Sequence, residues 1–418
     1  MRPPLTTLSL QALLALLSAA TLRAAAPAPA PLAPILEYKG NATIQPAYSI
    51  GEYVLSWRSE PLRRYRLEAS ADLRTWTTVT ERIAVGDTCR IRARPKYTPP
   101  WDKPGQPDLE VRKFWRLVPF DVDSDADGIS DYDEHRAGTD PFAGTRISLT
   151  GPFVPFAMRF AGLAAAKQIK LCQDAGYTGI GLGGPGPLAD FIDEPDVISG
   201  KFRVYSMLWY QKVEGAAPAG VDPSVVNPML AKLRSMNAAF WVVASITKSA
   251  DTDPVTKAMG AKTEAFYHAI ADLCQAAGVQ LVLYPHAGCS IESAEEALVM
   301  RNRLAALGHP EVKISIHLCH EIVKGNRTRL GTIVAAVKDH LALASINGTN
   351  ATGSDWFNCI QTLDSGTYDP RPYLQALAAA GYTGPMEYQT YDLPDPEKDD
   401  HLPRALARWH QLVAPPSP

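Results

Sequence analysis

The sequence lacks the marks of several common protein classes. Its 418 residues include 41 basic and 44 acidic ones, a balance that leaves no surplus of Lys and Arg for binding nucleic-acid phosphates. After the first 30 residues, no continuous apolar run reaches the ~18 residues that a membrane helix requires. No GxSxG motif occurs, so the sequence signal of a serine hydrolase is missing. We therefore expect a globular protein whose partner is neither nucleic acid nor membrane.

Cysteine is also scarce, with six residues in the whole chain. None of them forms a CxxC pair, which disfavours a structural zinc ribbon. The even count permits disulfides in an oxidising compartment, but the spacings form no dense framework. We expect most of the six to be buried free thiols.

Residues 1–30 have the pattern of an export signal followed by a Pro/Ala linker. Arg2 precedes an apolar run over 8–22, and a string of alanines follows. A positive start, a short apolar centre and an Ala-rich exit are typical of a secretory signal peptide, here cut near Ala26. An uncleaved anchor helix is the alternative. We predict a periplasmic or secreted protein, exported in the bacterial manner, with no membrane contact after cleavage.

Residues 36–120 predict a small β module. Short runs rich in aromatic and β-branched residues stand at 53–57, 65–69, 76–80 and 114–118. Runs at this spacing, separated by polar turns, predict an antiparallel β-sandwich. The segments YRLEASADLRTWTTV and FWRLVP resemble the fibronectin-type-III-like modules of exported bacterial enzymes. The resemblance implies either a spacer or a module that contacts carbohydrate.

The acidic segment 121–142 carries a calcium-ligand pattern. In a twelve-residue loop numbered from Asp123, oxygen ligands fall at positions 1, 3, 5, 7, 9 and 12, which are Asp123, Asp125, Asp127, the Ile129 carbonyl, Asp131 and Glu134. Gly128 stands at position 6, where such a loop turns sharply. These carboxylates would repel one another without a cation, so we predict a structural Ca²⁺. The segment DSDADGISDYDEHRAGTDP resembles a thrombospondin-type-3 or dockerin-type repeat; a solvated acidic linker is the alternative.

From residue 147 onward, strand-like runs alternate with helical stretches. Strands are predicted at 178–183, 202–209, 240–245, 279–285, 312–318, 341–347, 359–363 and 385–389. Helices are predicted at 161–175, 223–236, 262–277, 293–306, 330–340 and 371–380. This alternation predicts an α/β fold, a (β/α)₈ TIM barrel over 147–414, with a doubly wound open sheet as the alternative.

Barrel geometry places the chemistry at the carboxyl ends of the strands, where alternate residues face the interior. The alternation in four strands directs polar residues inward, namely Tyr284, His286, Ser315, His317, Ser345, Asn347, Glu387 and Gln389. The apolar residues between them, Ala342 included, are expected to face outward. His286, His317 and Glu387, with His320 at the rim, form the kind of group that a divalent metal or an acid–base site requires.

Four segments carry a resemblance to a known family. They are LVLYPHAGCSIESAEEALVM, ISIHLCHE, SINGTN and LDSGTYDPRPYLQALAAAGYTGPMEYQ. Together they resemble the xylose-isomerase-like superfamily, and in particular its sugar phosphate isomerases and epimerases. The resemblance implies a divalent metal held by two acids, an Asp and a His. That metal polarises a carbonyl or hydroxyl while a carboxylate moves a proton at the neighbouring carbon.

Carried onto this chain, the resemblance implies specific metal ligands. The superfamily's D-x-x-H appears here as His317-Leu318-Cys319-His320, so a His takes the Asp position. His286 stands where a strand-end acid is expected, with Glu292 six residues later as its substitute. The implied ligands are therefore His317, His320 and Glu292. A His-rich shell favours Zn²⁺, Mn²⁺ or Co²⁺ over Mg²⁺.

The remaining site residues are candidates for catalysis and substrate contact. Glu387 or Glu321 is the expected base, with His286 beside it. Substrate contacts are assigned to Asn347, Gln389, Trp209 and Tyr284. The two aromatic rings would stack on a sugar face, although core packing explains such rings equally well. Glu387 paired with a basic residue, and Glu321 as a surface cap, are the alternatives.

Two functions follow from these expectations. The first is an exported carbohydrate-active enzyme, an isomerase, epimerase or lyase, that moves a proton next to a carbonyl of a small sugar or polyol with a metal as electrophile. Because an exported protein meets few phosphorylated sugars, we expect a neutral or oxidised one. The second is a non-catalytic carbohydrate-binding barrel displayed on a calcium-stiffened spacer.

Overall fold

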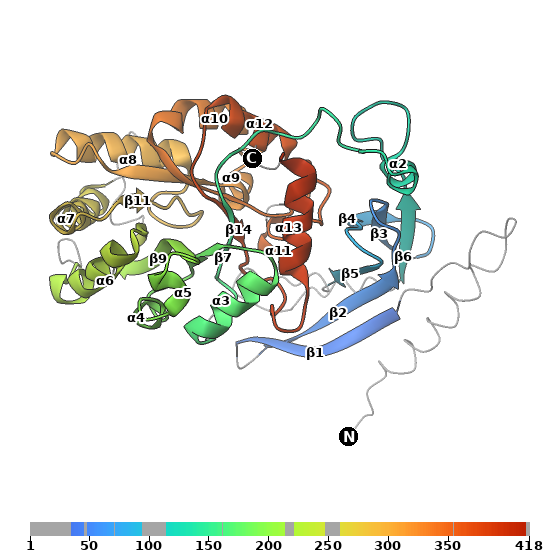
Figure 1. The fold of residues 1–418 in the computed structure, drawn as a ribbon, viewed down its shortest axis with the longest axis horizontal. Coiled ribbons are helices and arrows are strands. Elements are labelled where there is room, and N and C mark those ends of the chain that lie inside the picture. Colours follow the sequence, from blue (N-terminus) through green and yellow to red (C-terminus); the bar gives the residue numbers. More distant parts are fainter. Residues whose placement is uncertain are drawn as a thin grey trace, which may run out of the picture. The chain divides into compact units, whose positions relative to one another are not determined.

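Figure 1 shows the computed structural model of the chain. It describes residues 35–45, 48–70, 72–93, 114–160, 162–213, 221–246, 260–353 and 355–414. The chain divides into two compact units, 1–143 and 144–418. The predicted signal and linker at 1–30 lie outside the described residues. Within the described part, no helix combines the length and the apolar character needed to cross a bilayer.

The first unit contains two antiparallel sheets of three strands. Their strands are β1 (Ile35–Gln45), β2 (Tyr48–Arg58), β3 (Arg64–Ser70), β4 (Thr77–Ile83), β5 (Thr88–Ala93) and β6 (Phe114–Phe120). One sheet has the order β1-β2-β5 and the other β4-β3-β6. Trp57 and Ile91 of the first sheet share one apolar core with Tyr65 and Leu67 of the second. The two sheets therefore face each other across a common core, and the likeness to a fibronectin-type-III module stays a prediction.

A short helix, α2 (Asp131–Ala137), follows the acidic loop. At its start, the Ser130 side chain caps the helix by accepting a hydrogen bond from the Asp133 backbone N–H. The helix ends at Gly138, whose φ of 79° lies in the left-handed region that favours glycine. The Tyr132 hydroxyl donates to Glu60 Oε1 at 2.7 Å. This bond ties the helix that follows the acidic loop to the β module of the same unit.

The second unit is a closed barrel of eight parallel strands. They are β7 (Phe153–Phe156), β8 (Gly179–Leu182), β9 (Arg203–Val213), β10 (Ala239–Ile246), β11 (Leu281–Leu283), β12 (Lys313–His317), β13 (Leu341–Ile346) and β14 (Met386–Gln389). Each strand pairs with its sequence neighbours, and β14 closes the ring against β7. The predicted (β/α)₈ barrel is confirmed, and the open-sheet alternative is excluded.

Helices surround the strands of this unit (Figure 1). They are α3 (Ala165–Asp174), α4 (Leu188–Phe191), α5 (Pro195–Ile198), α6 (Pro223–Met236), α7 (Ala261–Ala277), α8 (Ala294–Ala306), α9 (Leu318–Val323), α10 (Leu330–Val337), α11 (Trp356–Cys359), α12 (Arg371–Ala379) and α13 (His401–Leu412). Local signals start and stop them. Ser293 caps α8 by accepting from the Glu296 backbone N–H, and Gly278 ends α7 with a φ of 67°.

One predicted strand is wrong and one real strand was missed. The predicted strand at 359–363 makes only an isolated bridge between Gly348 and Gln361. It follows directly on α11, which Asp355 caps by accepting from the Asn358 backbone N–H. The missed strand is β7, whose sequence contains Pro155. Because proline has no N–H to donate, this segment reads as a loop, yet Pro155 pairs in register with Tyr388.

The strand alternation sorts apolar side chains into two layers. Residues such as Leu281, Ile314 and Tyr388 lie in the large core between strands and helices. A second, smaller core lies inside the barrel and is formed by Phe156, Leu208, Trp241, Val243, Val282, Tyr284, Cys289 and Leu343. The predicted parity therefore holds with one exception. Ala342 packs against the inner core rather than outward, because the register between β12 and β13 shifts at Ile314/Ser315.

All six cysteines are buried free thiols, where the sequence led us to expect this of most of them. They lie at Cys89, Cys172, Cys274, Cys289, Cys319 and Cys359. Burial raises the pKa of Cys359 to about 12, with the nearby Asp355 carboxylate acting in the same direction. Burial also raises the pKa of Cys172, Cys274 and Cys319, so these four thiols remain protonated and act as small apolar groups.

Candidate active site

Trp241 of β10 organises the interior of the barrel. Its ring lies 4.9 Å from that of Phe156 and 4.6 Å from that of Tyr284, measured between centroids. Its indole N–H donates to Ser315 Oγ at 2.7 Å. The His317 ring stacks on it at 4.6 Å with an interplanar angle of 22°. Trp241 thus forms an apolar surface against which the polar residues of the lumen are held.

His317 is fully buried at the end of β12. Its Nδ1 lies 2.7 Å from Ser345 Oγ and its Nε2 lies 3.3 Å from Ser315 Oγ. Burial, reinforced by the neighbouring His286, holds its pKa well below the ordinary value. His317 is therefore a neutral imidazole whose two nitrogens both face serine hydroxyls.

His320 and Tyr284 form the next pair toward the rim. Tyr284 Oη lies 3.0 Å from His320 Nε2, and the Ala287 backbone N–H donates to His320 Nδ1 at 3.4 Å. Because Nδ1 accepts, the neutral ring carries its proton on Nε2 and donates it to Tyr284 Oη. Burial holds the pKa of His320 well below its ordinary value and that of Tyr284 well above it. The Tyr284 O–H consequently stays protonated and can itself serve as a donor.

His286 completes a cluster of three imidazoles. Its ring centroid lies 4.1 Å from that of His320, and the His317 and His320 centroids are 5.3 Å apart. His286 Nδ1 lies 2.8 Å from the Ala287 carbonyl oxygen, and burial lowers its pKa. Trp356 lies beside the cluster, 5.2 Å from the His320 ring. The tertiary structure therefore brings the three predicted histidines together, as the strand alternation suggested.

Glu387 of β14 lies in the same layer of the barrel as His317. In the strand register, His317 pairs with Ser345 and Ser345 pairs with Glu387. Glu387 Oε1 accepts a hydrogen bond from Ser206 Oγ at 2.6 Å, whereas Oε2 has no hydrogen-bond partner. The side chain is fully buried, and this burial raises the pKa of Glu387 from its ordinary 4.5 to about 8. The hydrogen bond from Ser206 acts in the opposite direction, but its effect is smaller.

Gly181 of β8 makes room for this carboxyl group. A Cβ atom at residue 181 would lie 2.3 Å from Glu387 Oε2. Neither Gly181 nor Ser206 is among the site residues predicted from the sequence. The alternation within β9 carries the missing signal, because Ser206 is a small polar residue of the same parity as the inward-facing Leu208.

Asn347 and Gln389 lie in the same buried region and are largely used in internal contacts. The Asn347 amide donates to the carbonyl oxygens of Gly348 and Cys359 at 2.7 and 2.6 Å, while its Oδ1 has no partner. Gln389 Oε1 accepts from the Tyr391 backbone N–H at 3.0 Å, and the Gln389 side chain hydrogen-bonds Tyr284. Both residues are placed where a substrate contact was predicted, and that role stays a prediction.

Three other predicted residues do not join the lumenal group. Trp209 belongs to the outer core, where its ring stacks with those of Phe240 and Phe266 at 5.5 and 6.2 Å. Glu321 is buried and accepts from the Ala294 backbone N–H and the Asn326 amide at 2.7 and 2.6 Å. It therefore caps the first turn of α8, as the alternative for this residue expected, but it does so in the interior and not at the surface.

Glu292, the third of these residues, is held by a lysine. Lys324 Nζ donates to Glu292 Oε2 at 2.8 Å, and the Gly288 backbone N–H donates to Oε1 at 2.7 Å. The carboxylate is near enough to His286 to favour its charged form. It nevertheless stays bound to its own partners and does not complete a ligand set with the imidazoles.

The lumenal residues do not fit a divalent metal as the resemblance implied. In the described ranges, no three ligand side chains of the barrel mouth gather closely enough for one ion. Both nitrogens of His317 face serine hydroxyl groups, and both nitrogens of His320 are engaged by Tyr284 Oη and the Ala287 backbone N–H. A ligating imidazole requires a free nitrogen lone pair. The geometry therefore supports acid–base chemistry here better than metal binding.

Two groups of metal-ligand side chains do occur in the described part of the chain. One is His268, Asp272 and His309, outside the barrel lumen. The other consists of Asp123, Asp125 and Asp127, the first three predicted calcium ligands.

The acidic loop is shaped mainly by its own backbone. Asp123 accepts from the backbone N–H groups of Ala126 and Gly128 at 2.7 and 2.8 Å. Asp131 is fully buried, and its two carboxylate oxygens accept hydrogen bonds from the backbone N–H and the hydroxyl of Ser124, both at 2.7 Å. Of the predicted ligands, Asp131 is therefore engaged within the loop rather than gathered with the three exposed or half-buried aspartates.

Glu134 occupies the closing position of the loop. Its side chain is buried, its Oε1 accepts from the Thr139 hydroxyl at 3.1 Å, and its Oε2 has no hydrogen-bond partner. Desolvation raises the pKa of Glu134, and the carboxylates of Asp125, Asp127 and Asp131 act in the same direction. An unpartnered carboxylate oxygen beside other carboxylates is a site where a cation would be stabilised.

Comparisons with known proteins place the chain in no family. No family model matches the sequence, and no curated protein matches it. Among solved structures, the chain resembles 3-keto-D-glucoside 4-epimerase from E. coli, with 13% identity, 62% of this chain and 99% of that chain covered, and a TM-score of 0.45.

Two further solved structures are similar to the same extent. For D-allulose 3-epimerase from Methylomonas sp., the identity is 17%, the coverage 64% of this chain and 99% of that chain, and the TM-score 0.45. For the probable 3-DHS dehydratase AsbF from Bacillus anthracis, the identity is 10%, the coverage 63% of this chain and 100% of that chain, and the TM-score 0.47. The barrel itself is established by its own strand pairing, independently of these likenesses.

Proposed function

We propose that the barrel is an enzyme that moves a proton at a carbon next to a carbonyl group of a small sugar or polyol. The observation that carries this proposal is the buried Glu387 carboxyl group, with a pKa of about 8 and one oxygen atom without a partner. A general acid–base group works best when its pKa lies near the working pH, and an ordinary carboxyl group is far too acidic for this. Glu387 is the group in the lumen that meets this requirement.

In this mechanism the chain's own residues supply both the base and the electrophile. Glu387 in its ionised form takes the proton from the carbon and returns it, and Ser206 fixes the orientation of the carboxyl group. The negative charge that develops on the carbonyl oxygen is stabilised by the Tyr284 O–H, which His320 holds through its Nε2. Because the imidazoles are neutral, they orient hydroxyl groups without adding charge to the lumen.

The proposal is tested by hydrogen exchange at carbon. The full-length protein is incubated in D₂O with a panel of ketoses, aldoses and uronic acids, and loss of a carbon-bound hydrogen is followed by NMR. We expect exchange with at least one sugar, and a decrease of about 10²- to 10⁴-fold in the Glu387→Gln variant. The Glu321→Gln variant separates the two predicted bases and should keep its activity. Exchange that survives in Glu387→Gln but not in Glu321→Gln would reverse the assignment.

A non-catalytic carbohydrate-binding barrel is the second candidate. It is favoured by one observation: the nitrogen atoms of His317 and His320 are all engaged in internal hydrogen bonds. If this function is correct, a sugar of the same panel binds without any exchange in D₂O. Binding would then also persist in the Glu387→Gln variant.

For the first unit we propose a structural calcium site in the acidic loop. Asp123, Asp125 and Asp127 already bring one carboxylate oxygen each within 4.8 Å of the others, and Glu134 supplies an unpartnered oxygen. The Ile129 carbonyl is the remaining predicted ligand, whereas Asp131 holds Ser124 with both of its oxygens and supports the loop from outside the proposed ligand set. Chelation should increase protease cleavage within 121–140, and an unchanged cleavage pattern would contradict the site.

We further propose export through residues 1–30. The support is the arrangement of Arg2, the apolar run and the alanines in the sequence. Mass spectrometry of protein recovered from the periplasm or the medium of a bacterial host should give a mature N-terminus near Ala26. Protein that stays in the cytoplasm with its N-terminus intact would rule this out.

A further inference from the structure

A second histidine group lies outside the barrel lumen, in the helical layer. His268 and Asp272 stand four residues apart on α7, and residues with this spacing lie on the same face of a helix, one turn apart. The same spacing is used by helical metal sites with two ligands on one face. The third residue, His309, lies in the segment between α8 and β12.

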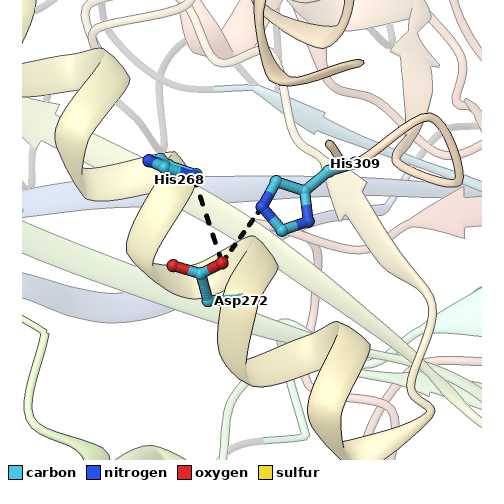
Figure 2. Close-up of side chains that lie close together, drawn as sticks. All are labelled: His268, Asp272 and His309. Carbon is cyan, nitrogen blue, oxygen red and sulfur yellow. Dashed lines mark ion pairs between the residues drawn. The ribbon is translucent and has the colours of Figure 1, made fainter. Parts of the chain in front are cut away.

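The three side chains converge on one oxygen atom. Figure 2 shows both imidazole rings directed at the Asp272 carboxylate. His309 Nε2 lies 3.1 Å from Asp272 Oδ1, and His268 Nε2 lies 4.0 Å from the same oxygen. Two ligands of a tetrahedral zinc ion, each about 2.0 Å from the metal, are separated by about 3.3 Å. The His309–Asp272 pair already has this separation, and the partly exposed His268 must move about 0.7 Å closer to Asp272 Oδ1 to reach it.

A second carboxylate lies near the other ring nitrogen of His309. Its side chain is only 3% exposed, and its Nδ1 makes no hydrogen bond but lies 3.5 Å from Glu311 Oε1. A carboxylate behind one ring nitrogen keeps the proton on that nitrogen and leaves the other as a lone-pair donor. The buried His309 therefore directs Nε2 at the point where Asp272 and His268 meet, as a metal-ligating histidine does.

We propose that His268 Nε2, His309 Nε2 and Asp272 Oδ1 bind a zinc ion, with a water molecule as the fourth ligand. Two imidazoles and one carboxylate match the ligand preferences of Zn²⁺, whereas Mg²⁺ and Ca²⁺ prefer oxygen atoms alone. The ion can enter from solvent, because His268 and Asp272 are 38% and 61% exposed. Nothing in this proposal depends on the activity proposed for the lumen.

The position of the site indicates a structural role. The segment that contains His309 leads into the amino-terminal end of β12, and this end of a barrel lies opposite the catalytic mouth. The Gln275 side chain of α7 already donates to the Gly308 carbonyl of this segment at 3.4 Å, and Arg303 of α8 pairs with Glu264 of α7 at 3.3 Å. A bound ion would add a stronger link between α7 and the segment after α8.

The experiment is a zinc titration of the full-length, metal-stripped protein with excess calcium present to fill the acidic loop. Zinc affinity is measured by competition with a chromogenic chelator, and cobalt is used as a spectroscopic substitute. We expect one tight zinc site per chain and tetrahedral cobalt absorption bands. The variants His268→Ala and Asp272→Asn change partly exposed side chains and should weaken zinc binding by about 100-fold or more. Glu311→Gln should weaken it by about 10-fold.

The matched control is His410→Ala, which removes an exposed histidine elsewhere in the same unit. This variant should bind zinc like the unaltered protein, and zinc should raise its Tm equally. Zinc should fail to raise the Tm of His268→Ala. Equal zinc affinity in His268→Ala, Asp272→Asn and His410→Ala would overturn the proposal, as would cobalt spectra of octahedral type.

Discussion

The two histidine groups of the barrel unit differ in what surrounds them. In the lumen, His286, His317 and His320 are packed against aromatic rings and hydrogen-bonded to hydroxyl and backbone groups. Outside the lumen, His268 of α7 and His309 of the segment after α8 face carboxylates, and His268 and Asp272 are open to solvent whereas His309 is buried. The comparison shows that clustering of histidines does not by itself make a metal site. A metal site also needs a carboxylate ligand beside the imidazoles and a ring nitrogen that is free to bind the ion. Among the described residues of the barrel unit, these occur together at His268, Asp272 and His309, outside the lumen.

The largest expected effect concerns the titration of the buried carboxyl group of the lumen. Burial raises the pKa of Glu387 from 4.5 to about 8, so the folded protein binds a proton that the unfolded chain releases. The contribution of Glu387 to the free energy of unfolding should therefore fall by about 3 to 5 kcal/mol as pH rises from 4.5 to 8. Urea unfolding of the barrel at pH 5 to 8.5 measures this, with Glu387→Gln as reference.

The lumenal histidines act in the opposite direction and at lower pH. Because burial lowers the pKa of His317 and His320, the unfolded chain binds their protons more readily, and stability decreases as pH falls below about 6.5. This contribution is common to the unaltered protein and Glu387→Gln, so it cancels in their difference. Parallel stability curves for the two proteins would show that Glu387 titrates normally.

The second prediction concerns the Tyr284 hydroxyl group, the proposed hydrogen-bond donor to the substrate carbonyl. Tyr284→Phe loses the hydroxyl group that His320 holds, and the exchange rate at carbon should fall by about 100-fold with little loss of sugar binding. Tyr177→Phe is the matched control, because its hydroxyl is also buried but bonds the Leu402 carbonyl outside the lumen. Equal rates in both variants would mean that Tyr284 only packs.

The third prediction concerns Gly181→Ala, which adds a methyl group beside the Glu387 carboxyl group. A Cβ at residue 181 would lie 2.3 Å from Glu387 Oε2, so Gly181→Ala should lower the free energy of unfolding by about 1 to 3 kcal/mol and displace the carboxyl group. Gly184→Ala is the control, since nothing lies within 4 Å of a Cβ there. Thermal unfolding and the exchange assay report both effects. Indistinguishable variants would show that Glu387 moves aside freely.

The smallest effect extends the comparison to the carboxylates of the first unit. Asp127→Asn should remove one calcium ligand and abolish the calcium-dependent rise in the Tm of this unit, which we expect to be about 5 °C. Asp87→Asn, an exposed aspartate of the same unit, should keep the full rise. A calcium effect that both variants retain would place the ion elsewhere.

Much of the barrel could be predicted because its strands follow simple rules. The alternation in 312–318 put Ser315 and His317 inside correctly, since Ile314 and Ile316 could only face the helices. The segment AGYTG occurs twice, at 175–179 and 380–384, and its first glycine follows a helix end both times: Gly176 and Gly381 adopt φ of 93° and 70°. The strand around Pro155 was missed because its pairing depends on β14, more than 200 residues later.

The partners of the site residues could not be read from the chain. Nothing local distinguishes Glu387, whose Oε2 is unpartnered, from Glu321, whose oxygens support α8. The sequence was compatible with Trp209 as a ring that stacks on a sugar, but in the fold this ring packs against Phe266 in the outer core. Each of these outcomes depends on a residue far away in sequence, so no local pattern contains it.

The sequence by itself determined the periodicity, the order of strands and helices, the acidic loop and the set of histidines near strand ends. Only the tertiary structure decided which of these groups are neutral, which are engaged and which are free. The physical reason is that a side chain's charge and reactivity depend on desolvation and on contacts at 3 to 4 Å. Closing the barrel sets both at once, by placing Gly181 and Ser206 around Glu387 and by bringing His309 to α7.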